Sequence, residues 1–244
     1  MRWGDRLFTI RELADDCRNR TLAWLSCAEA EQLRTFGDAG SSLRWLAGRY
    51  AVKRLLGELR PSRDPFSDLH IESRDGRGRK VRPIAHLRGQ LQPWSLSLAH
   101  TEKYVYVAAA LSPRLRVGVD VVEVDSVVPG AIAFWFTPAE KDWCGKIGHS
   151  AAFALVWSLK EAWYKAETSG EPFAPRRLDV CGLLPHGAAI RKQLTGGWPY
   201  DAVVWERSGR HISIRRNRSA LATLVVAGSD SRFRQFECFP DLNA

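Results

Sequence analysis

The chain has 244 residues, 45% hydrophobic and 26% charged, which is enough for one sizeable core or two small lobes. Its formal net charge of +9 indicates an anionic partner: a nucleic acid, a membrane surface, or an acidic protein or ligand. The sequence has no signal core and no apolar run long enough to span a membrane, and its five cysteines are widely spaced. These features predict a soluble cytoplasmic protein with reduced thiols rather than a membrane protein or a zinc domain.

The first hundred residues are predicted to contain helices followed by strands. Periodicity and capping signals predict helices over 27–36, with Ser26 as N-cap, and over 42–57, then strands over 69–72, 94–100 and 104–111. Residues 61–93 are rich in Arg, Gly, Asp and Pro, which predicts loops around the first of these strands.

A Val-rich stretch over 115–124 is predicted to be a strand, and it contains Asp120. An unpaired buried carboxylate is costly, so this side chain is expected to have a partner. Two interpretations remain open at this point: a metal ion, or a turn cap or arginine partner at the strand end.

The stretch 151–168 is predicted to be a helix with a continuous apolar arc. Trp157, Glu161 and Lys165 recur every fourth residue at the edge of that arc. A solvated Glu–Lys pair is the common explanation of such spacing, but the aromatic surroundings favour a site. We predict that Asp120 and Glu161 share a hard divalent cation such as Mg²⁺, which takes carboxylate oxygens alongside substrate phosphates.

The remaining segments complete the predicted organisation. They are a helix over 138–146, a meander of strands over 202–206, 211–216 and 221–227, and a loosely structured tail from 229. The predicted boundaries are an N-terminal lobe over 1–116, a C-terminal lobe over 117–228 and a tail over 229–244.

Five segments, in order along the chain, resemble motifs of the 4′-phosphopantetheinyl transferases, specifically the larger Sfp-type enzymes. Two are specific: Gly118-Val119-Asp120 fits a G-[VI]-D strand motif, and Trp157–Lys165 fits a W-[ST]-x-K-E-[AS]-x-x-K helix motif. The other three are Arg44–Lys53, Leu96–Thr101 and Phe136–Trp143.

The resemblance implies an α+β fold of two similar α/β lobes related by a pseudo-twofold, with coenzyme A in the cleft between them. It implies a monomer, because one chain supplies both lobes. The implied reaction is Mg²⁺-dependent transfer of 4′-phosphopantetheine from coenzyme A to a serine of an acyl or peptidyl carrier protein, with release of 3′,5′-ADP. Carrier proteins are acidic, which suits a basic enzyme.

The resemblance also implies residue roles. Asp120 and Glu161 would bind the metal, Glu161 would accept the serine proton, and Lys165 would stabilise charge on the pyrophosphate. The predicted coenzyme contacts are Lys160 and His100 for the phosphates, and Arg44, Arg49, Arg79 and Lys80 for the nucleotide and its 3′-phosphate.

Three departures from the family pattern stand out. Many members have a second carboxylate two residues after the strand Asp, where this chain has Val122, and Glu123 is expected on the opposite face. The family's G-K-P segment is blurred over 76–83. The lysines that some family members use for the 3′-phosphate are also absent, and Glu29 and Gln32 stand in their places. Nearby arginines, such as Arg34, Arg44 or Arg49, are the candidate substitutes.

Two other classes of function compete. A basic nucleic-acid-binding protein would explain the charge but not the acid pair. A non-catalytic, carrier-binding relative would explain the departures but not the retention of all four charged motif residues.

Overall fold

The computed structural model describes residues 2–19, 22–60, 65–74, 80–167, 172–185, 190, 194, 203–207, 209–216 and 219–228. Helices and antiparallel sheets are mixed along the chain, so the fold class is α+β, as predicted. The described chain divides into two compact units, Met1–Val117 and Gly118–Gly228, and each has its own hydrophobic core. The predicted tail from residue 229 lies outside the described residues.

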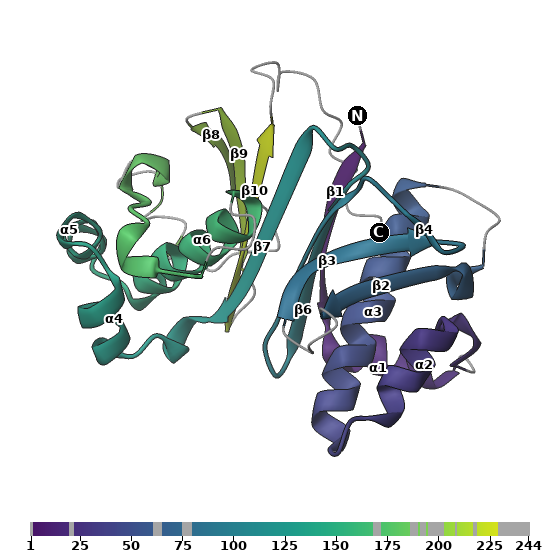
Figure 1. The fold of residues 1–244 in the computed structure, drawn as a ribbon. Helices are drawn as coiled ribbons and strands as arrows, with labels where there is room; N and C mark the ends of the chain where they lie inside the picture. Colours follow the sequence, from purple (N-terminus) through teal and green to yellow (C-terminus); the bar gives the residue numbers. More distant parts are fainter. Residues whose placement is uncertain are drawn as a thin grey trace. The chain divides into compact units, whose positions relative to one another are not determined.

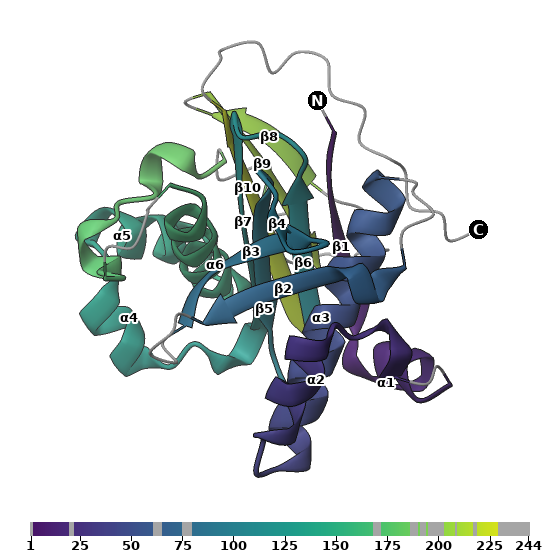
Figure 2. The ribbon, with the colours of Figure 1, turned by 45° about the vertical axis from the view of Figure 1, so that its right-hand side comes forward.

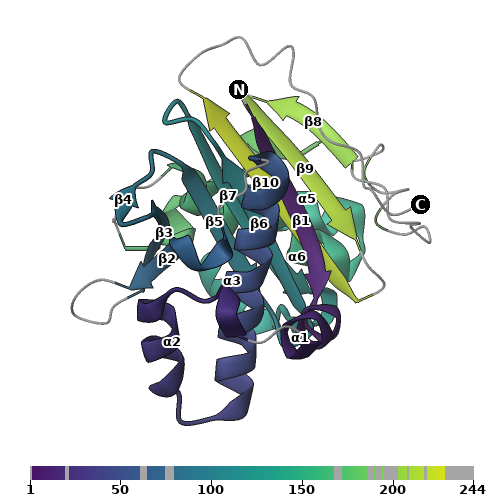
Figure 3. The ribbon, with the colours of Figure 1, turned by 90° about the vertical axis from the view of Figure 1, so that its right-hand side faces the viewer.

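Unit 1 combines a three-stranded sheet, a separate hairpin sheet and three α-helices. Its elements are β1 (Trp3–Thr9), α1 (Ile10–Asn19), η1 (Leu22–Trp24), α2 (Cys27–Arg34), α3 (Ala39–Leu59), η2 (Phe66–Asp68), β2 (Leu69–Arg74), β3 (Lys80–Leu87), β4 (Gln90–Leu91), β5 (Ser95–His100) and β6 (Tyr104–Ala110). The main sheet has the antiparallel order β1-β6-β5, and α3 packs along it (Figure 3).

Side-chain capping explains where α2 and α3 begin, and the predicted N-cap Ser26 is confirmed. Ser26 and Glu29 form a reciprocal capping box at α2, and Asp38 caps α3, which extends further at both ends than the predicted 42–57. In both cases a side-chain oxygen satisfies backbone N–H groups that the first helical turn leaves free.

The prediction of loops around one short strand in 61–93 was wrong for residues 80–91, and β1 and α1 were not predicted. Strands β3 and β4 form an antiparallel sheet with β2 (Figure 2). The β3–β4 turn has positive φ at both central residues, Arg88 (50°) and Gly89 (77°), which matches the twist of a two-residue hairpin. Arg in place of the usual Asn or Asp hid this turn in the sequence.

Unit 2 is built around a four-stranded sheet with the order β7-β10-β9-β8. Its elements are β7 (Leu115–Glu123, which starts in unit 1), η3 (Val124–Ser126), α4 (Pro129–Trp135), α5 (Pro138–Ile147), α6 (Ser150–Glu167), η4 (Pro175–Arg177), η5 (Cys181–Leu183), β8 (Val203–Arg207), β9 (Arg210–Arg216) and β10 (Ala220–Gly228). The predicted meander of the last three strands is confirmed by the antiparallel pairing of β9 with both β8 and β10.

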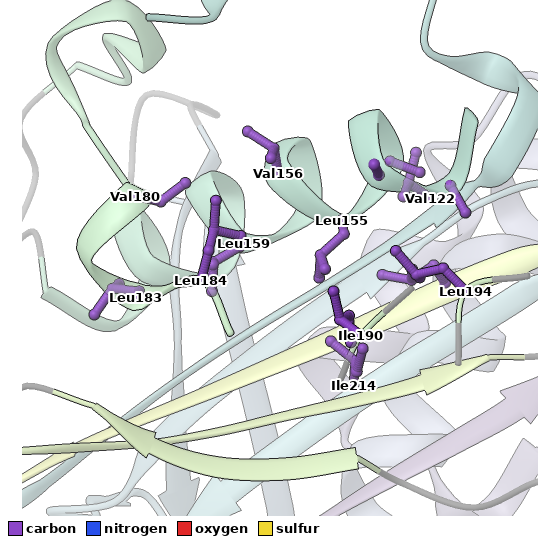
Figure 4. Packing of buried hydrophobic residues seen from close by; sticks show 14 of the residues in the cluster. Val122, Leu155, Val156, Leu159, Val180, Leu183, Leu184, Ile190, Leu194 and Ile214 are labelled. Carbon is purple, nitrogen blue, oxygen red and sulfur yellow. The ribbon is translucent and has the colours of Figure 1, made fainter. Parts of the chain in front are cut away.

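Helix α6 lies against this sheet (Figure 1). Its apolar side is buried. Leu155, Val156 and Leu159 are fully buried in the core cluster of unit 2, and Leu155 points from α6 toward Ile214 (Figure 4). The predicted apolar arc is therefore confirmed, and it fixes which residues of α6 remain outside the core. None of the helices in the described ranges is long and apolar enough to cross a membrane.

Candidate active site

A glycine sets the distance between β7 and α6. A Cβ atom at Gly118 would lie 1.9 Å from the carbonyl oxygen of Ala162 and 2.6 Å from the backbone nitrogen of Ala166. Both contacts are with backbone, so any side chain at this position would separate the strand from the helix. The close approach brings Asp120, two residues further along β7, next to the polar edge of α6.

Three charged side chains meet at this edge, and we call them the acid cluster: Asp120 from β7, and Glu161 and Lys165 from α6. The Lys165 ammonium donates to Asp120 Oδ1 at 2.9 Å and lies 3.6 Å from Glu161 Oε2. It also donates to the Val119 carbonyl oxygen at 3.2 Å. The side chains of Asp120, Glu161 and Lys165 are 11%, 21% and 28% exposed, so the cluster is sheltered but reachable by a ligand.

Burial and mutual charge perturb all three groups of the acid cluster. Burial raises the pKa of the Asp120 carboxyl, although the Lys165 ammonium opposes the shift. Burial also raises the pKa of Glu161, and the neighbouring Asp120 charge adds to that shift. For Lys165, burial alone would lower the pKa, but the two carboxylates outweigh it and raise the pKa. The cluster thus holds two carboxylates that compete for one cation.

The match to known families covers this cluster. Residues 116–217 match the model of the 4′-phosphopantetheinyl transferase superfamily. This part of the chain is a 4′-phosphopantetheinyl transferase superfamily domain. The predicted family is confirmed at this level, while the Sfp-type subtype stays a prediction. No curated protein matches the chain.

The transferase domain offers two carboxylates for a divalent metal ion. Within the described residues, no three His, Cys, Asp or Glu side chains are grouped as a complete metal site. The donor set nevertheless fits Mg²⁺, because that ion is often held by one or two carboxylates and completes its shell with waters and substrate phosphates. The Lys165 ammonium occupies the place between the acids where a positive charge is favoured.

Val122 and Glu123 differ in burial, as side-chain alternation along a strand predicts. Val122 packs in the unit 2 core, and Glu123 is partly exposed at the end of β7. The chain therefore brings two acids to Lys165, and the described contacts do not include Glu123 among them.

Lys160, a predicted phosphate ligand in the transferase domain, is fully buried. Its ammonium lies 2.7 Å from Glu140 Oε2 and donates to the carbonyl oxygens of Pro175 and Leu178 at 2.8 and 2.5 Å. These three oxygens account for its donors, so the geometry favours a structural role over the predicted contact with phosphate. Glu140 lies in the Phe136–Trp143 motif segment, and its spacing from Thr137 is that of a capping box.

The predicted coenzyme residues of unit 1 have different surroundings. Arg44 makes a two-pronged contact with Glu102 at 3.0 and 2.8 Å and is partly exposed. Arg49 is buried, donates to the Ser73 hydroxyl at 2.5 Å and stacks on Trp45, and burial lowers its pKa to about 10. This geometry leaves Arg44 better placed than Arg49 for an external phosphate.

The other predicted coenzyme residues are less constrained by the structure. His100 is exposed at the end of β5. Lys80 begins β3, but its side chain is outside the described part of the chain, as is Arg79 entirely. Their roles stay predictions.

Proposed function

We propose that this protein transfers 4′-phosphopantetheine from coenzyme A to a serine of an acyl or peptidyl carrier protein and releases 3′,5′-ADP, as a monomeric Sfp-type enzyme. The observation that carries the proposal is the acid cluster, in which Asp120 and Glu161 meet at Lys165 within a domain of the transferase superfamily. The net charge of +9 supports an acidic protein partner and an anionic co-substrate.

The residues of the acid cluster suit the steps of this reaction. Asp120 and Glu161 would hold Mg²⁺, which supplies charge neutralisation at the pyrophosphate. Glu161, with its raised pKa, is the group suited to accept the proton of the attacking serine hydroxyl. Lys165 keeps its proton and would stabilise the negative charge that develops on the departing nucleotide.

The first test uses intact-protein mass spectrometry of an apo carrier protein incubated with the enzyme, coenzyme A and Mg²⁺. We expect a mass gain of one phosphopantetheine, which EDTA and mutation of the carrier serine abolish. Asp120→Asn and Glu161→Gln should each lower turnover by roughly 10²-fold or more, because each removes a charge that acts on the reacting groups.

The control is Asp142→Asn, which alters an exposed carboxylate that pairs with Lys146 on α5. It should keep normal turnover. Normal turnover with an unchanged Mg²⁺ requirement in either cluster variant would contradict the metal assignment. The absence of any mass gain on acyl, peptidyl and aryl carriers would favour a non-catalytic, carrier-binding relative.

A further inference from the structure

The buried Glu140–Lys160 pair ties together three segments of unit 2. Glu140 Oε1 accepts a hydrogen bond from the Val180 backbone N–H at 2.9 Å, while its Oε2 lies 2.7 Å from the Lys160 ammonium. Lys160 in turn binds the carbonyl oxygens of Pro175 and Leu178. One ion pair therefore joins the start of α5, the middle of α6 and the 175–180 segment.

The same construction occurs in unit 1. Glu29 Oε1 accepts a hydrogen bond from the Ile71 N–H at 3.0 Å, and its Oε2 lies 2.5 Å from the Lys53 ammonium. Lys53 also donates to the carbonyl oxygens of Trp24 and Phe66 at 3.0 and 2.9 Å. Both glutamates close a capping box at the start of a helix, and both pairs are fully buried.

The charged residues that follow the two lysines along their helices have opposite signs. In unit 2, Lys160 is followed directly by Glu161, and Lys165 comes one turn later. In unit 1, Lys53 is followed directly by Arg54, and Glu58 comes one turn later.

The strand partner is inverted in the same way. Glu58 lies 3.0 Å from Arg6 of β1 and 3.7 Å from Arg54, so these three residues reverse the charges of the acid cluster, and Arg54 also pairs with Asp16 at 3.3 Å. The same buried Glu–Lys pair therefore occurs beside two clusters of different charge, only one of which joins two carboxylates at one lysine.

The placement of Lys160 determines the direction of the next residue. Consecutive side chains on a helix are rotated by about 100°, so fixing Lys160 to three oxygens fixes the rotation of α6 and thereby the direction of Glu161. Removing one partner of a buried ion pair is strongly destabilising, because the other charge stays buried without compensation.

We infer that Lys160 and Glu140 are positioning residues, which hold α6 so that Glu161 faces Asp120, and that Lys160 does not bind the coenzyme phosphates. The inference rests on the proposed function for the meaning of the acid pair, but its structural part stands on the contacts of unit 2 alone.

The experiment compares two matched double variants, Glu140→Gln with Lys160→Met in unit 2, and Glu29→Gln with Lys53→Met in unit 1. Changing both partners avoids a lone buried charge, and Gln keeps an oxygen for the capping box. Both variants should unfold at a lower temperature than the wild type. A lower Tm in both double variants would therefore report only the structural role that the two buried pairs share.

Two binding measurements on the folded proteins separate positioning from ligation. We expect the unit 2 variant to lose roughly 10-fold or more in Mn²⁺ affinity, measured by electron paramagnetic resonance, and to keep its affinity for coenzyme A in EDTA. The unit 1 variant should change Mn²⁺ affinity little. Unchanged Mn²⁺ affinity with weaker coenzyme A binding in the unit 2 variant would overturn the inference and restore Lys160 as a phosphate ligand.

Hydrogen exchange of the α6 amides keeps the inference testable without a metal. Exchange near Glu161 should be faster in the unit 2 variant and unchanged in the unit 1 variant. Equal exchange in wild type and unit 2 variant would overturn the positioning role. A wild-type protein that binds no Mn²⁺ would instead overturn the metal assignment in the proposed function, and the exchange result would still decide the role of the pair. If a double variant does not fold, the single Glu140→Gln variant serves for the same measurements.

Discussion

Among the residues that the structure describes, Lys165 is the cation that contacts both carboxylates of the acid cluster. Without it, Asp120 and Glu161 would face each other across a sheltered site with no positive charge between them. Their pKa values, already raised by burial, would rise further.

This leads to a prediction for Lys165→Met. A carboxyl whose folded-state pKa is raised binds its proton more tightly in the folded protein, so protonation stabilises the fold. The variant should therefore be close to wild-type stability in acid and lose about 1–3 kcal/mol as the pH rises through these raised pKa values. Urea unfolding over a pH series measures it.

Lys146→Met is the matched control, because it removes an exposed lysine that pairs with Asp142 four residues earlier. Such exposed pairs contribute about 0.5 kcal/mol or less, so its stability should follow that of the wild type at every pH. A loss that does not depend on pH in Lys165→Met would show that the lysine acts through packing and not through charge.

The types of the site residues could be predicted from the sequence, but some of their directions could not. Asp120 and Glu161 were predicted as partners, and the contacts of Lys165 bring both acids to one ammonium. Lys160 belongs to the same motif, yet its side chain is buried and pairs with Glu140 of α5. A motif on one helix gives no information about a contact with another helix, so this direction could not be predicted. Nothing in the sequence assigns Glu140 a chemical role, and only its capping-box spacing from Thr137 indicates a structural one.

At the scale of the elements, the close approach of β7 to α6 decides whether the acid cluster forms. Gly118 is the position where the strand backbone meets the helix backbone. Backbone atoms of a packed helix cannot turn aside as a side chain can, so added volume at this position must move the helix.

Gly118→Ala should therefore destabilise unit 2 by about 3 kcal/mol, as overpacking of a tight contact does. The matched control is Gly4→Ala on β1, where the new Cβ would meet only the side chains of Leu59 at 3.2 Å and Leu55 at 3.5 Å. Thermal unfolding of both variants measures the difference. Similar Tm values for the two would mean that α6 adapts to the added methyl group.

Element prediction succeeded where one signal dominated. Helix α6 was predicted to within a residue at each end, because its apolar arc is continuous over five turns. Strand β1 was missed because Gly4, Asp5 and Arg6 interrupt the hydrophobic pattern. Asp5 is buried there and accepts a hydrogen bond from the Tyr106 hydroxyl at 2.8 Å, a contact that spans a hundred residues and leaves no local trace.

At the scale of the whole molecule, the two units differ in how they should respond to a divalent cation. The acid cluster of unit 2 has one positive and two negative charges, whereas Arg6, Arg54 and Glu58 of unit 1, with Asp16 beside Arg54, have no excess of negative charge. A cation that binds only the folded form of unit 2 stabilises it by about 2.7 kcal/mol at a hundred times its Kd.

Hydrogen exchange with and without Mg²⁺ tests this difference. Amides of β7 and α6 should exchange more slowly when Mg²⁺ is present, and those of β1 and α3 should not change. Equal slowing of the four elements would point to a general salt effect instead of a site in unit 2.

Unit 1 gives each experiment on the acid cluster an internal reference in the same molecule: a buried Glu–Lys pair of the same kind, beside a cluster with no excess of negative charge, at the same temperature and concentration. A change in both halves reports on the solvent or the protein as a whole, and a change in one half reports on the ligand.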